Sequence, residues 1–476
     1  MKVGNNQVSI GGIVGYNYAD IINSQNDGKI IIKNTVKSNI GGIVGQDKYK
    51  QTIYGCTNTS EIIGENIEGN IAGIIGSASF SIVNLINNDN LGNITLKSID
   101  ESTSRTSVAG ICAYKNYDAL LYNCINRGNI TIEDATKSKN AEIFIAGILG
   151  RSNGSVYRLS NKLYNYGNLT VKNSASPVWA SGCISNEEIR VGKAVNKGNI
   201  EINGETTLII SGINNGYSYN QSDMNDGEKI NYGDIKATSK SGNVYVYGIN
   251  RYSNNIEIKQ KNYGNIYAKG QKVTVRGICG TAYQADYDEC FNKGNITVEA
   301  YSANVSGLTE HGRKFKNCYN EGNIEILSDG DVECAGIAIV GGGNGANSNC
   351  YNSGNINIYS NGYTVVTGLI FDGSGIKDSY NKGNISVINN SITSMTGICR
   401  SMSSILNCYN TGNMNLVTTK SSYNIVSGIS FNSNRPVNCY NEGDITVING
   451  GESTWVDPIR AFPGIYEHSL RSCEFI

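Results

Sequence analysis

The chain has 476 residues, including 57 Gly and only 4 Pro, and its 39 basic and 40 acidic residues give a formal net charge of −1. A nucleic-acid-binding protein needs a basic surface to displace phosphate counterions, so the balanced charge argues against such a partner. No run of 18 apolar residues is present, so no membrane insertion is predicted.

The first residues contain no basic segment followed by an apolar one, so the sequence has no recognisable signal peptide.

A motif, Asn-x-Gly-Asn-Ile, recurs roughly every 32 residues. Ser60 is the one replacement of its Gly, and Leu169 and Met414 are the replacements of its Ile. The fourteen copies begin at Asn26, Asn58, Asn90, Asn126, Asn165, Asn196, Asn231, Asn262, Asn292, Asn320, Asn352, Asn381, Asn410 and Asn441.

The motif Gly is followed by segments such as Ile94-Thr95-Leu96, whose apolar and polar residues alternate as in a strand with one buried face. A second element, Gly followed by Ile, Leu or Cys, recurs once per repeat, and helical periodicity is absent. One such coil cannot bury its own inner face, so the repeats must stack. The sequence predicts an all-β, parallel β-solenoid (β-helix) of about 14 coils, each with three short strands, over residues 1–449. Residues 450–476 are expected to form a divergent last coil or a C-terminal cap.

Stacking places equivalent residues over one another, so the motif Ile should form an aliphatic column and the motif Asn a ladder of hydrogen-bonded amides. We expect the Asn and the following Gly to take the left-handed backbone of a sharp turn. Fourteen equal copies favour a structural role over a ligand site. In the C-terminal half this ladder comprises Asn292, Asn320, Asn352, Asn381, Asn410 and Asn441.

An aromatic residue precedes the motif Asn in six consecutive copies. Strand alternation turns these rings outward, where they are either a binding platform for a glycan or a partner protein, or a reinforcement of the stack. The residues are Phe291, Tyr319, Tyr351, Tyr380, Tyr409 and Tyr440.

The second position before the motif Asn, next to the aromatic where one is present, is Cys in seven copies and a small residue, Ser24, Ala194 or Ser379, in others. Interchange with Ser and Ala predicts buried thiols rather than disulfides. The seven are Cys56, Cys124, Cys290, Cys318, Cys350, Cys408 and Cys439.

Two acidic groups, Asp286-Tyr287-Asp288-Glu289 and Asp329 to Glu333, are the candidates for catalytic carboxylates or calcium ligands. Both lie in polar, turn-like stretches, where solvated acidic residues are the simpler interpretation. The chain has two histidines, His311 and His468, and no Cys-x-x-Cys, so neither a zinc site nor any other cofactor is predicted.

The segments Gly11-Gly12-Ile13-Val14-Gly15 and Ala146-Gly147-Ile148-Leu149-Gly150, with Asn438-Cys439-Tyr440-Asn441-Glu442-Gly443-Asp444-Ile445, resemble the GLUG repeat. GLUG repeats occur in large bacterial surface proteins, including the stalks of immunoglobulin-A-cleaving metallopeptidases. The resemblance implies a non-enzymatic spacer or adhesive segment at the bacterial surface, from a longer protein. The alternative is a polysaccharide-processing β-helix enzyme or a phage-tail-like depolymerase.

Overall fold

A computed structural model describes most of the chain, and its residues fall into two compact units, Met1–Tyr252 and Ser253–Ile476. No helix long and apolar enough to cross a membrane occurs among them. The described residues are 8–78, 83–99, 105–117, 119–136, 141–153, 156–185, 189–218, 227–253, 257–281, 285–342, 347–418, 423–433, 436–449, 454–457 and 474–475.

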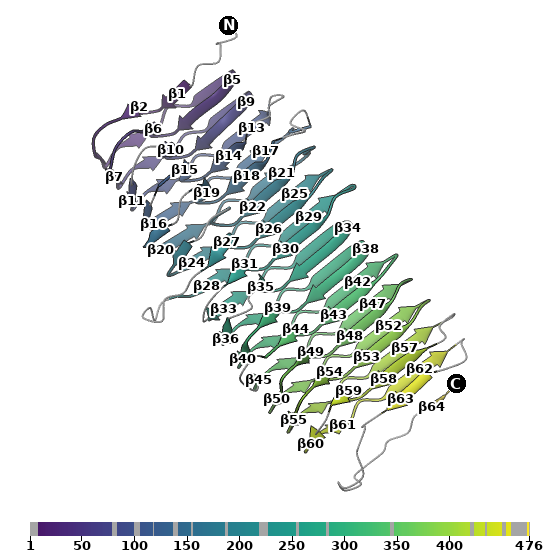
Figure 1. Cartoon of the computed structure of the whole chain (residues 1–476). Coiled ribbons are helices and arrows are strands. Elements are labelled where there is room, and N and C mark those ends of the chain that lie inside the picture. The colour runs from purple at the N-terminus through teal and green to yellow at the C-terminus, as the bar shows by residue number, and fades with distance from the viewer. Residues whose placement is uncertain are drawn as a thin grey trace. The chain divides into compact units, whose positions relative to one another are not determined.

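Each unit is a stack of β-coils, as Figure 1 shows. Every strand pairing within a unit is parallel, and the described residues contain no helix. The predicted all-β, parallel β-solenoid is therefore confirmed. There are about 12 turns, about 31 residues apart. This number is slightly lower than the 14 coils predicted.

One coil of the second unit illustrates the path of the chain. The ladder strand β41 (Tyr319–Asn320) leads through the motif Gly into the motif strand β42 (Ile324–Ser328). The pre-corner strand β43 (Val332–Ala335) and the post-corner strand β44 (Ala338–Gly341) flank Gly336-Ile337, which we call the corner. A short lead strand, β45 (Asn347–Ser348), returns the chain to the next ladder strand. The sequence predicts three short strands per coil, and this coil has five.

The same five classes recur in the first unit, where several merge. Its motif and pre-corner strands are β1 (Val8–Gly11), β5 (Ile30–Gly41), β9 (Ile62–Ala72), β13 (Ile94–Ser98), β14 (Thr106–Ala109), β17 (Ile130–Ile132), β18 (Ile143–Ala146), β21 (Leu169–Val171), β22 (Val178–Ser181), β25 (Ile200–Gly204), β26 (Leu208–Ser211), β29 (Ile235–Ser239) and β30 (Val244–Tyr247). Its post-corner strands are β2 (Val14–Asn17), β6 (Val44–Asp47), β10 (Ile75–Ala78), β15 (Cys112–Lys115), β19 (Leu149–Ser152), β27 (Asn214–Ser218) and β31 (Asn250–Ser253). Its lead and ladder strands are β3 (Ile21–Ile22), β4 (Gln25–Asn26), β7 (Gln51–Tyr54), β8 (Thr57–Asn58), β11 (Val83–Ile86), β12 (Asp89–Asn90), β16 (Ala119–Asn126), β20 (Val156–Asn165), β23 (Ile189–Val191), β24 (Ala194–Asn196) and β28 (Lys229–Asn231).

The second unit repeats the classes more regularly. Its motif and pre-corner strands are β34 (Ile266–Arg276), β38 (Ile296–Ser306), β42, β43, β47 (Ile356–Ser360), β48 (Thr364–Thr367), β52 (Ile385–Asn389), β53 (Thr393–Thr396), β57 (Met414–Thr418), β58 (Asn424–Ser427), β62 (Ile445–Asn449) and β63 (Thr454–Asp457), with β64 (Glu474–Phe475) beside β62. Its post-corner strands are β35 (Cys279–Thr281), β39 (Thr309–Gly312), β44, β49 (Ile370–Gly373), β54 (Cys399–Met402) and β59 (Ser430–Ser433). Its lead and ladder strands are β32 (Glu257–Ile258), β33 (Gln260–Asn262), β36 (Asp286–Asp288), β37 (Phe291–Asn292), β40 (Lys314–Lys316), β41, β45, β46 (Tyr351–Asn352), β50 (Ile376–Lys377), β51 (Tyr380–Asn381), β55 (Ile405–Leu406), β56 (Tyr409–Asn410), β60 (Pro436–Val437) and β61 (Tyr440–Asn441).

The core consists of columns of equivalent side chains. In the second unit, the motif strands pair in register, so that their first residues lie over one another and are all buried. This confirms the predicted aliphatic column, which runs through Ile324, Ile356, Ile385, Met414 and Ile445.

The expected left-handed backbone at the motif Asn and Gly is wrong. The left-handed residue instead lies three positions before the motif Asn, at the turn that ends the lead strand, as at Asn317 with φ 53°. The motif Gly is needed for close packing, because a Cβ on Gly354 would lie 2.0 Å from the carbonyl oxygen of Gly322 in the preceding coil. Ser60 takes that place once, and its hydroxyl donates a hydrogen bond to the carbonyl oxygen of Gly28, 2.9 Å away.

A buried carboxyl in the first unit makes stability depend on pH. Asp47, at the end of β6, is 1% exposed, and its Oδ1 accepts a hydrogen bond of 2.9 Å from Nδ2 of Asn17. Burial raises the pKa of Asp47 to about 6. The folded state therefore holds a proton that the unfolded state releases, so stability falls as the pH rises from about 4 to about 6.

Replacing Asp47 by Asn should raise the free energy of unfolding of the first unit by about 2 kcal/mol at pH 7, because the amide carries no charge to desolvate. Urea denaturation at pH 4 and pH 7 measures the effect, and the gain should vanish at pH 4. The matched control is Asp27→Asn, since Asp27 is exposed. An equal gain in both variants at pH 7 would contradict this assignment.

Candidate binding surfaces

The six predicted aromatic residues form one continuous stack in the second unit. Neighbouring ring centroids lie between 4.7 and 5.1 Å apart, and each pair of planes is within 10° of parallel. The residues on either side of Tyr319, Cys318 and Asn320, are fully buried, whereas Tyr319 is half-buried on the outer side. We call this stack the aromatic ladder.

Stacking limits what the aromatic ladder can bind. Each inner ring covers the faces of its neighbours, so the faces that would pack on a sugar ring are occupied by other rings. The outward prediction is wrong for Phe291, which is buried, whereas the ring edges and phenol hydroxyls of the five tyrosines face the outer side. Burial raises the pKa values of Tyr319, Tyr351, Tyr380 and Tyr409, so these phenols stay neutral donors.

Charged side chains from adjacent coils edge the ladder. The Tyr351 hydroxyl donates a hydrogen bond of 2.9 Å to Oε1 of Glu321, and Nζ of Lys293 lies 2.9 Å from Oε2 of the same residue. Burial alone would raise the pKa of Glu321, but the hydrogen bonds from Lys293 and Tyr351 lower it overall. These partners tie three coils together.

The asparagine ladder is confirmed and is fully satisfied by the chain itself. Nδ2 of Asn352 donates to Oδ1 of Asn381 at 2.8 Å and to the carbonyl oxygen of Gly354 at 2.9 Å, while its Oδ1 accepts from Asn320 at 2.8 Å. The equivalent bonds join Asn292, Asn320, Asn352, Asn381, Asn410 and Asn441 in one row, and Asn26 to Asn231 in the first unit. The side-chain amides of the ladder hydrogen-bond to one another and to the backbone, which supports a structural role rather than a ligand site.

The prediction of unpaired thiols is confirmed for the twelve described cysteines, all of which are free. Eleven are buried and Cys439 is half-buried, while Cys473 lies outside the described residues. Burial raises the pKa values of Cys124, Cys183 and Cys399 to about 12, so these thiols are poor nucleophiles.

The acidic groups singled out in the sequence have partners in adjacent coils. Asp286 pairs with Arg313 through two contacts of 2.6 and 2.7 Å, and Asp288 accepts a hydrogen bond of 2.9 Å from Asn317. Oδ1 of Asp331 accepts from the backbone N–H of Tyr363 at 2.8 Å. Within the described residues, no three His, Cys, Asp or Glu side chains gather as metal ligands would. His468 lies outside them.

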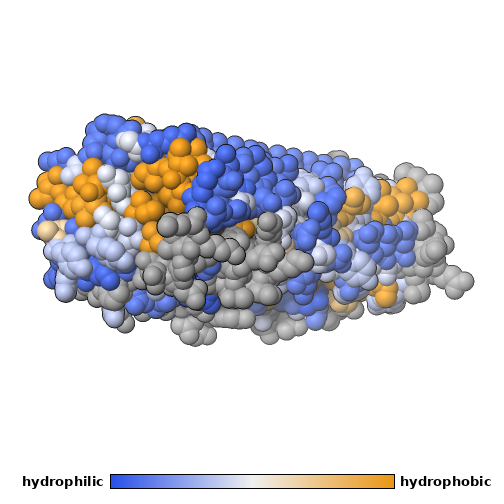
Figure 2. All heavy atoms as spheres, turned by 90° about the horizontal axis from the view of Figure 1, so that it is seen from above, coloured by the Kyte–Doolittle hydropathy of each residue, from blue (hydrophilic) through white to orange (hydrophobic). Residues whose placement is uncertain are grey.

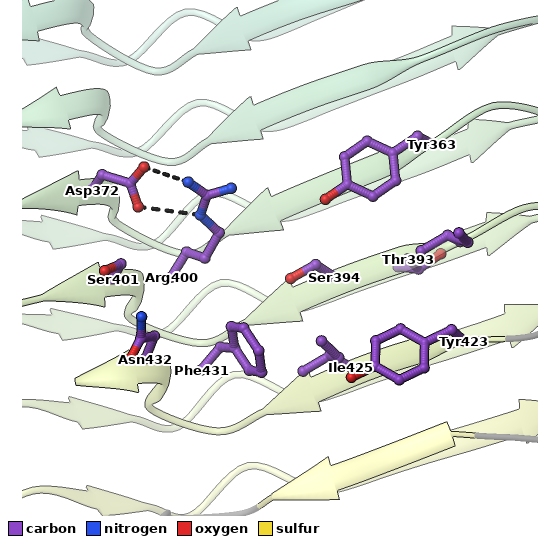
Figure 3. A pocket seen from close by; sticks show the side chains of 11 residues that line it. Tyr363, Asp372, Thr393, Ser394, Arg400, Ser401, Tyr423, Ile425, Phe431 and Asn432 are labelled. Carbon is purple, nitrogen blue, oxygen red and sulfur yellow. Dashed lines mark hydrogen bonds and ion pairs between the residues drawn. The ribbon is translucent and has the colours of Figure 1, made fainter. Parts of the chain in front are cut away.

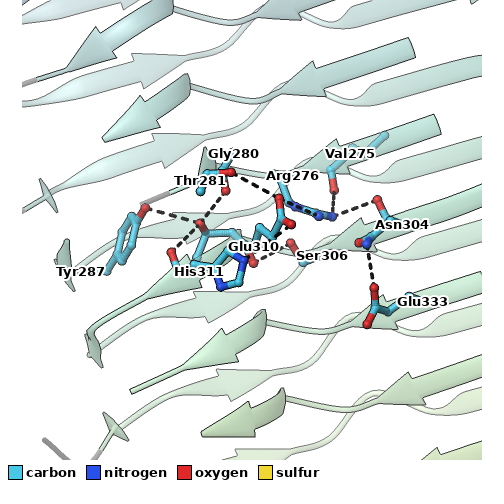
Figure 4. Close-up of polar contacts among 11 residues, drawn as sticks. Val275, Arg276, Gly280, Thr281, Tyr287, Asn304, Ser306, Glu310, His311 and Glu333 are labelled. Carbon is cyan, nitrogen blue, oxygen red and sulfur yellow. Dashed lines mark hydrogen bonds and ion pairs between the residues drawn. The ribbon is translucent and has the colours of Figure 1, made fainter. Parts of the chain in front are cut away.

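A polar cluster occupies two corners of the second unit (Figure 4). Arg276 is fully buried, and its Nη1 donates to the carbonyl oxygen of Asn304 at 2.9 Å, while its Nη2 lies 3.4 Å from Glu310. The imidazole of His311, 3.6 Å from Oε1 of Glu310, and the charge of Arg276 outweigh burial and lower the pKa of Glu310 to about 2. Asn304 also donates to Glu333 at 2.7 Å. The cluster therefore holds an ionised carboxylate.

Further along the same unit the corners open into a hollow, which we call the corner groove (Figure 3). Its volume is about 390 Å³. Pre-corner strands form one wall and post-corner strands the other, and in Figure 3 the bidentate pair of Arg400 and Asp372 stands on the post-corner wall. The lining residues are Tyr363, Asp372, Ile392, Thr393, Ser394, Arg400, Ser401, Tyr423, Ile425, Phe431 and Asn432.

Sequence reasoning missed the corner groove, although the sequence carries a signal for it. The third residue after the corner Gly is itself Gly in most coils near the N-terminus, as at Gly45 and Gly76. In the second unit the same place holds large side chains such as Phe371, Arg400 and Phe431. On the face shown in Figure 2, hydrophobic side chains gather in separate patches between hydrophilic stretches. The outer surface thus varies from coil to coil, while the interior repeats.

Comparison of the chain with protein-family models, with curated proteins and with solved structures finds no match.

Proposed function

We propose that the chain is a non-enzymatic repeat segment of a bacterial extracellular or cell-surface protein, which acts as a spacer and presents a binding surface for a glycan or a partner protein. One observation carries the proposal. The buried columns repeat in every coil and their polar groups bond to one another, whereas exposed residues beside the corners differ between coils, as with Tyr363, Ile392 and Tyr423. Stacked repeats of this kind hold a surface rigid while its residues vary.

The resemblance to GLUG repeats supports the placement at a bacterial surface. The Gly-Gly-Ile-Val-Gly segments that carry it, at Gly11 and Gly41, form the closed corners of the first unit. Two outward features are the candidates for the binding surface itself, namely the aromatic ladder and the corner groove.

A polysaccharide-processing enzyme is the alternative, and the state of the acidic residues singled out in the second unit disfavours it. Glycoside hydrolysis needs one carboxyl that is protonated near neutral pH to act as the general acid. Glu310, the carboxyl of the polar corner cluster, has a pKa of about 2 and stays ionised. The other acidic candidates, Asp286 and Asp331, hold adjacent coils together.

The proposal predicts binding without cleavage. A glycan array and a reducing-end release assay should be run on the same preparation of the whole chain. Binding with no release of reducing ends is the expected result, and release of ends would overturn the non-enzymatic assignment. A triple variant in which Phe replaces Tyr351, Tyr380 and Tyr409 should keep the ring stacking and lose the three hydroxyls. Loss of binding in that variant would assign the surface to the aromatic ladder.

A further inference from the structure

We propose that the corner groove is a binding site for a neutral oligosaccharide that lies across successive coils of the second unit. The inference deepens the proposed function, because it gives that function one site and one class of ligand. Three features of the groove support it: particular residues build the groove, its charges are already paired, and its walls offer side chains rather than free strand edges.

The corner groove exists because large side chains hold the two walls apart. In the first unit, a Cβ on Gly76 would lie 2.5 Å from the backbone nitrogen of Ile40 and 2.7 Å from the carbonyl oxygen of Gly45, so post-corner and pre-corner backbones are in direct contact there. In the second unit Ile339 and Phe371 occupy that place, together with Val365, and are almost fully buried. In the next two coils Arg400 and Phe431 take the same place after the corner Gly, and both line the groove.

The charged groups of the corner groove neutralise each other. Nε and Nη2 of Arg400 contact the two carboxylate oxygens of Asp372 at 3.1 and 2.5 Å, and the guanidinium lies 4.3 Å from the ring centre of Phe371. This bidentate pair fixes the orientation of the guanidinium, which has five N–H donors in total. Because Arg400 and Asp372 already pair with each other, a charged ligand would find no unpaired charge of opposite sign among them. The groove therefore favours a neutral ligand.

The remaining lining residues suit a sugar. Phe431 and Ile425 offer apolar surface, while Ser394, Ser401 and Asn432 offer hydroxyl and amide groups. Sugar rings present apolar C–H faces and many hydroxyls, and binding sites for small ligands commonly combine an apolar lining with a few placed polar groups.

An extended peptide is a poorer occupant. Peptides that bind along a sheet pair their backbone with an exposed strand edge. The pre-corner strands β48, β53 and β58 already pair with one another in register, so their backbone groups are engaged between coils.

The repeat of the coils sets the length of the ligand. Tyr363, Ile392 and Tyr423 precede residues that pair in register on three successive strands, and they are 46%, 39% and 44% exposed. Neighbouring strands are about 4.8 Å apart, so the two tyrosines are separated by roughly 10 Å. A sugar residue of a linear chain spans about one strand spacing, so two to three sugar units should reach from one tyrosine to the other.

Isothermal titration of the whole chain with neutral hexasaccharides of glucose, xylose and mannose, and with an acidic oligogalacturonate, tests the proposal. At least one neutral hexasaccharide should bind and the oligogalacturonate should bind at least tenfold more weakly. Tyr423→Ala and Arg400→Met should each weaken binding at least tenfold. The matched control is Tyr359→Ala, which should leave binding unchanged, because Tyr359 is 47% exposed on the same coil as Tyr363 but does not line the groove.

The outcomes separate this inference from the proposed function. If both groove variants still bind the sugar, or if only the aromatic-ladder variant loses binding, the groove is not the sugar-binding site. The proposed function would still hold in either case. If the chain releases reducing ends from a hexasaccharide, the proposed non-enzymatic function is wrong. If the groove variants also fail to bind that hexasaccharide, the groove is still supported as the binding site. Tighter binding of the oligogalacturonate, or no binding of any neutral hexasaccharide at millimolar concentration, overturns the groove. Unchanged far-UV circular dichroism and thermal midpoint in Tyr423→Ala and Arg400→Met verify that a loss of binding does not reflect unfolding.

Discussion

Replacing Asn352 by Ala is expected to lower the free energy of unfolding of the second unit by about 3–5 kcal/mol. Asn352 is fully buried and makes three hydrogen bonds. Without it, Nδ2 of Asn320 loses an acceptor, and Oδ1 of Asn381 and the carbonyl oxygen of Gly354 each lose a donor. Water cannot reach these groups, so each bears the cost of desolvation without a partner. Urea denaturation followed by near-UV circular dichroism, to which the stacked tyrosines contribute, measures the loss.

Asn355 is the matched control, since it lies in the same motif copy but is half-buried at the surface. Its Oδ1 accepts one hydrogen bond, of 2.9 Å, from the backbone N–H of Asn384. Water can replace that bond, so Asn355→Ala should cost at most about 1 kcal/mol. Equal losses in the two variants would show that the buried amide row contributes no more than a surface hydrogen bond.

The fold was predictable because stacking converts sequence period into spatial contact. Residues one repeat apart, such as Ile324 and Ile356 or Asn320 and Asn352, become direct neighbours. A residue type that recurs at one position therefore reports the environment of a whole column. The same logic explains why Tyr319 and Tyr351 could be placed on the outside, one over the other.

Features that depend on angles rather than on period could not be predicted. Asn occurs both at the left-handed position, as Asn317, and in the ladder, as Asn320, so residue type alone does not show which one turns the chain. The width of a corner likewise depends on how far Phe371 displaces its opposite wall. Face-to-face stacking of the aromatic rings, which closes them to a sugar, is a matter of side-chain rotation that the pattern leaves open.

A large steric effect is expected at the corner glycines, and Gly110→Ala should lower the free energy of unfolding of the first unit by at least about 4 kcal/mol. A Cβ there would lie 2.2 Å from the carbonyl oxygen of Gly147 and 2.3 Å from Cγ of Asn126. Neither neighbour can move away freely. That carbonyl accepts the N–H of Gly110 at 3.1 Å, and the Asn126 amide is fixed in the buried ladder by Asn90 and Asn165. The methyl group must therefore push adjacent coils apart.

Hydrogen–deuterium exchange of backbone amides, together with urea denaturation, measures this effect where it arises. Peptides that contain Gly110 and its neighbour Gly147 should exchange faster in Gly110→Ala than in the parent chain, because separated coils lose the hydrogen bonds between them. The control is Gly28→Ala, for which the nearest atom to a new Cβ, Oδ1 of Asn26, is 3.5 Å away. Gly28→Ala should change stability by less than about 1 kcal/mol. If Gly110→Ala matches the control in both measurements, adjacent corners do not pack as closely as these distances require, and the repeat must owe its glycine to another cause.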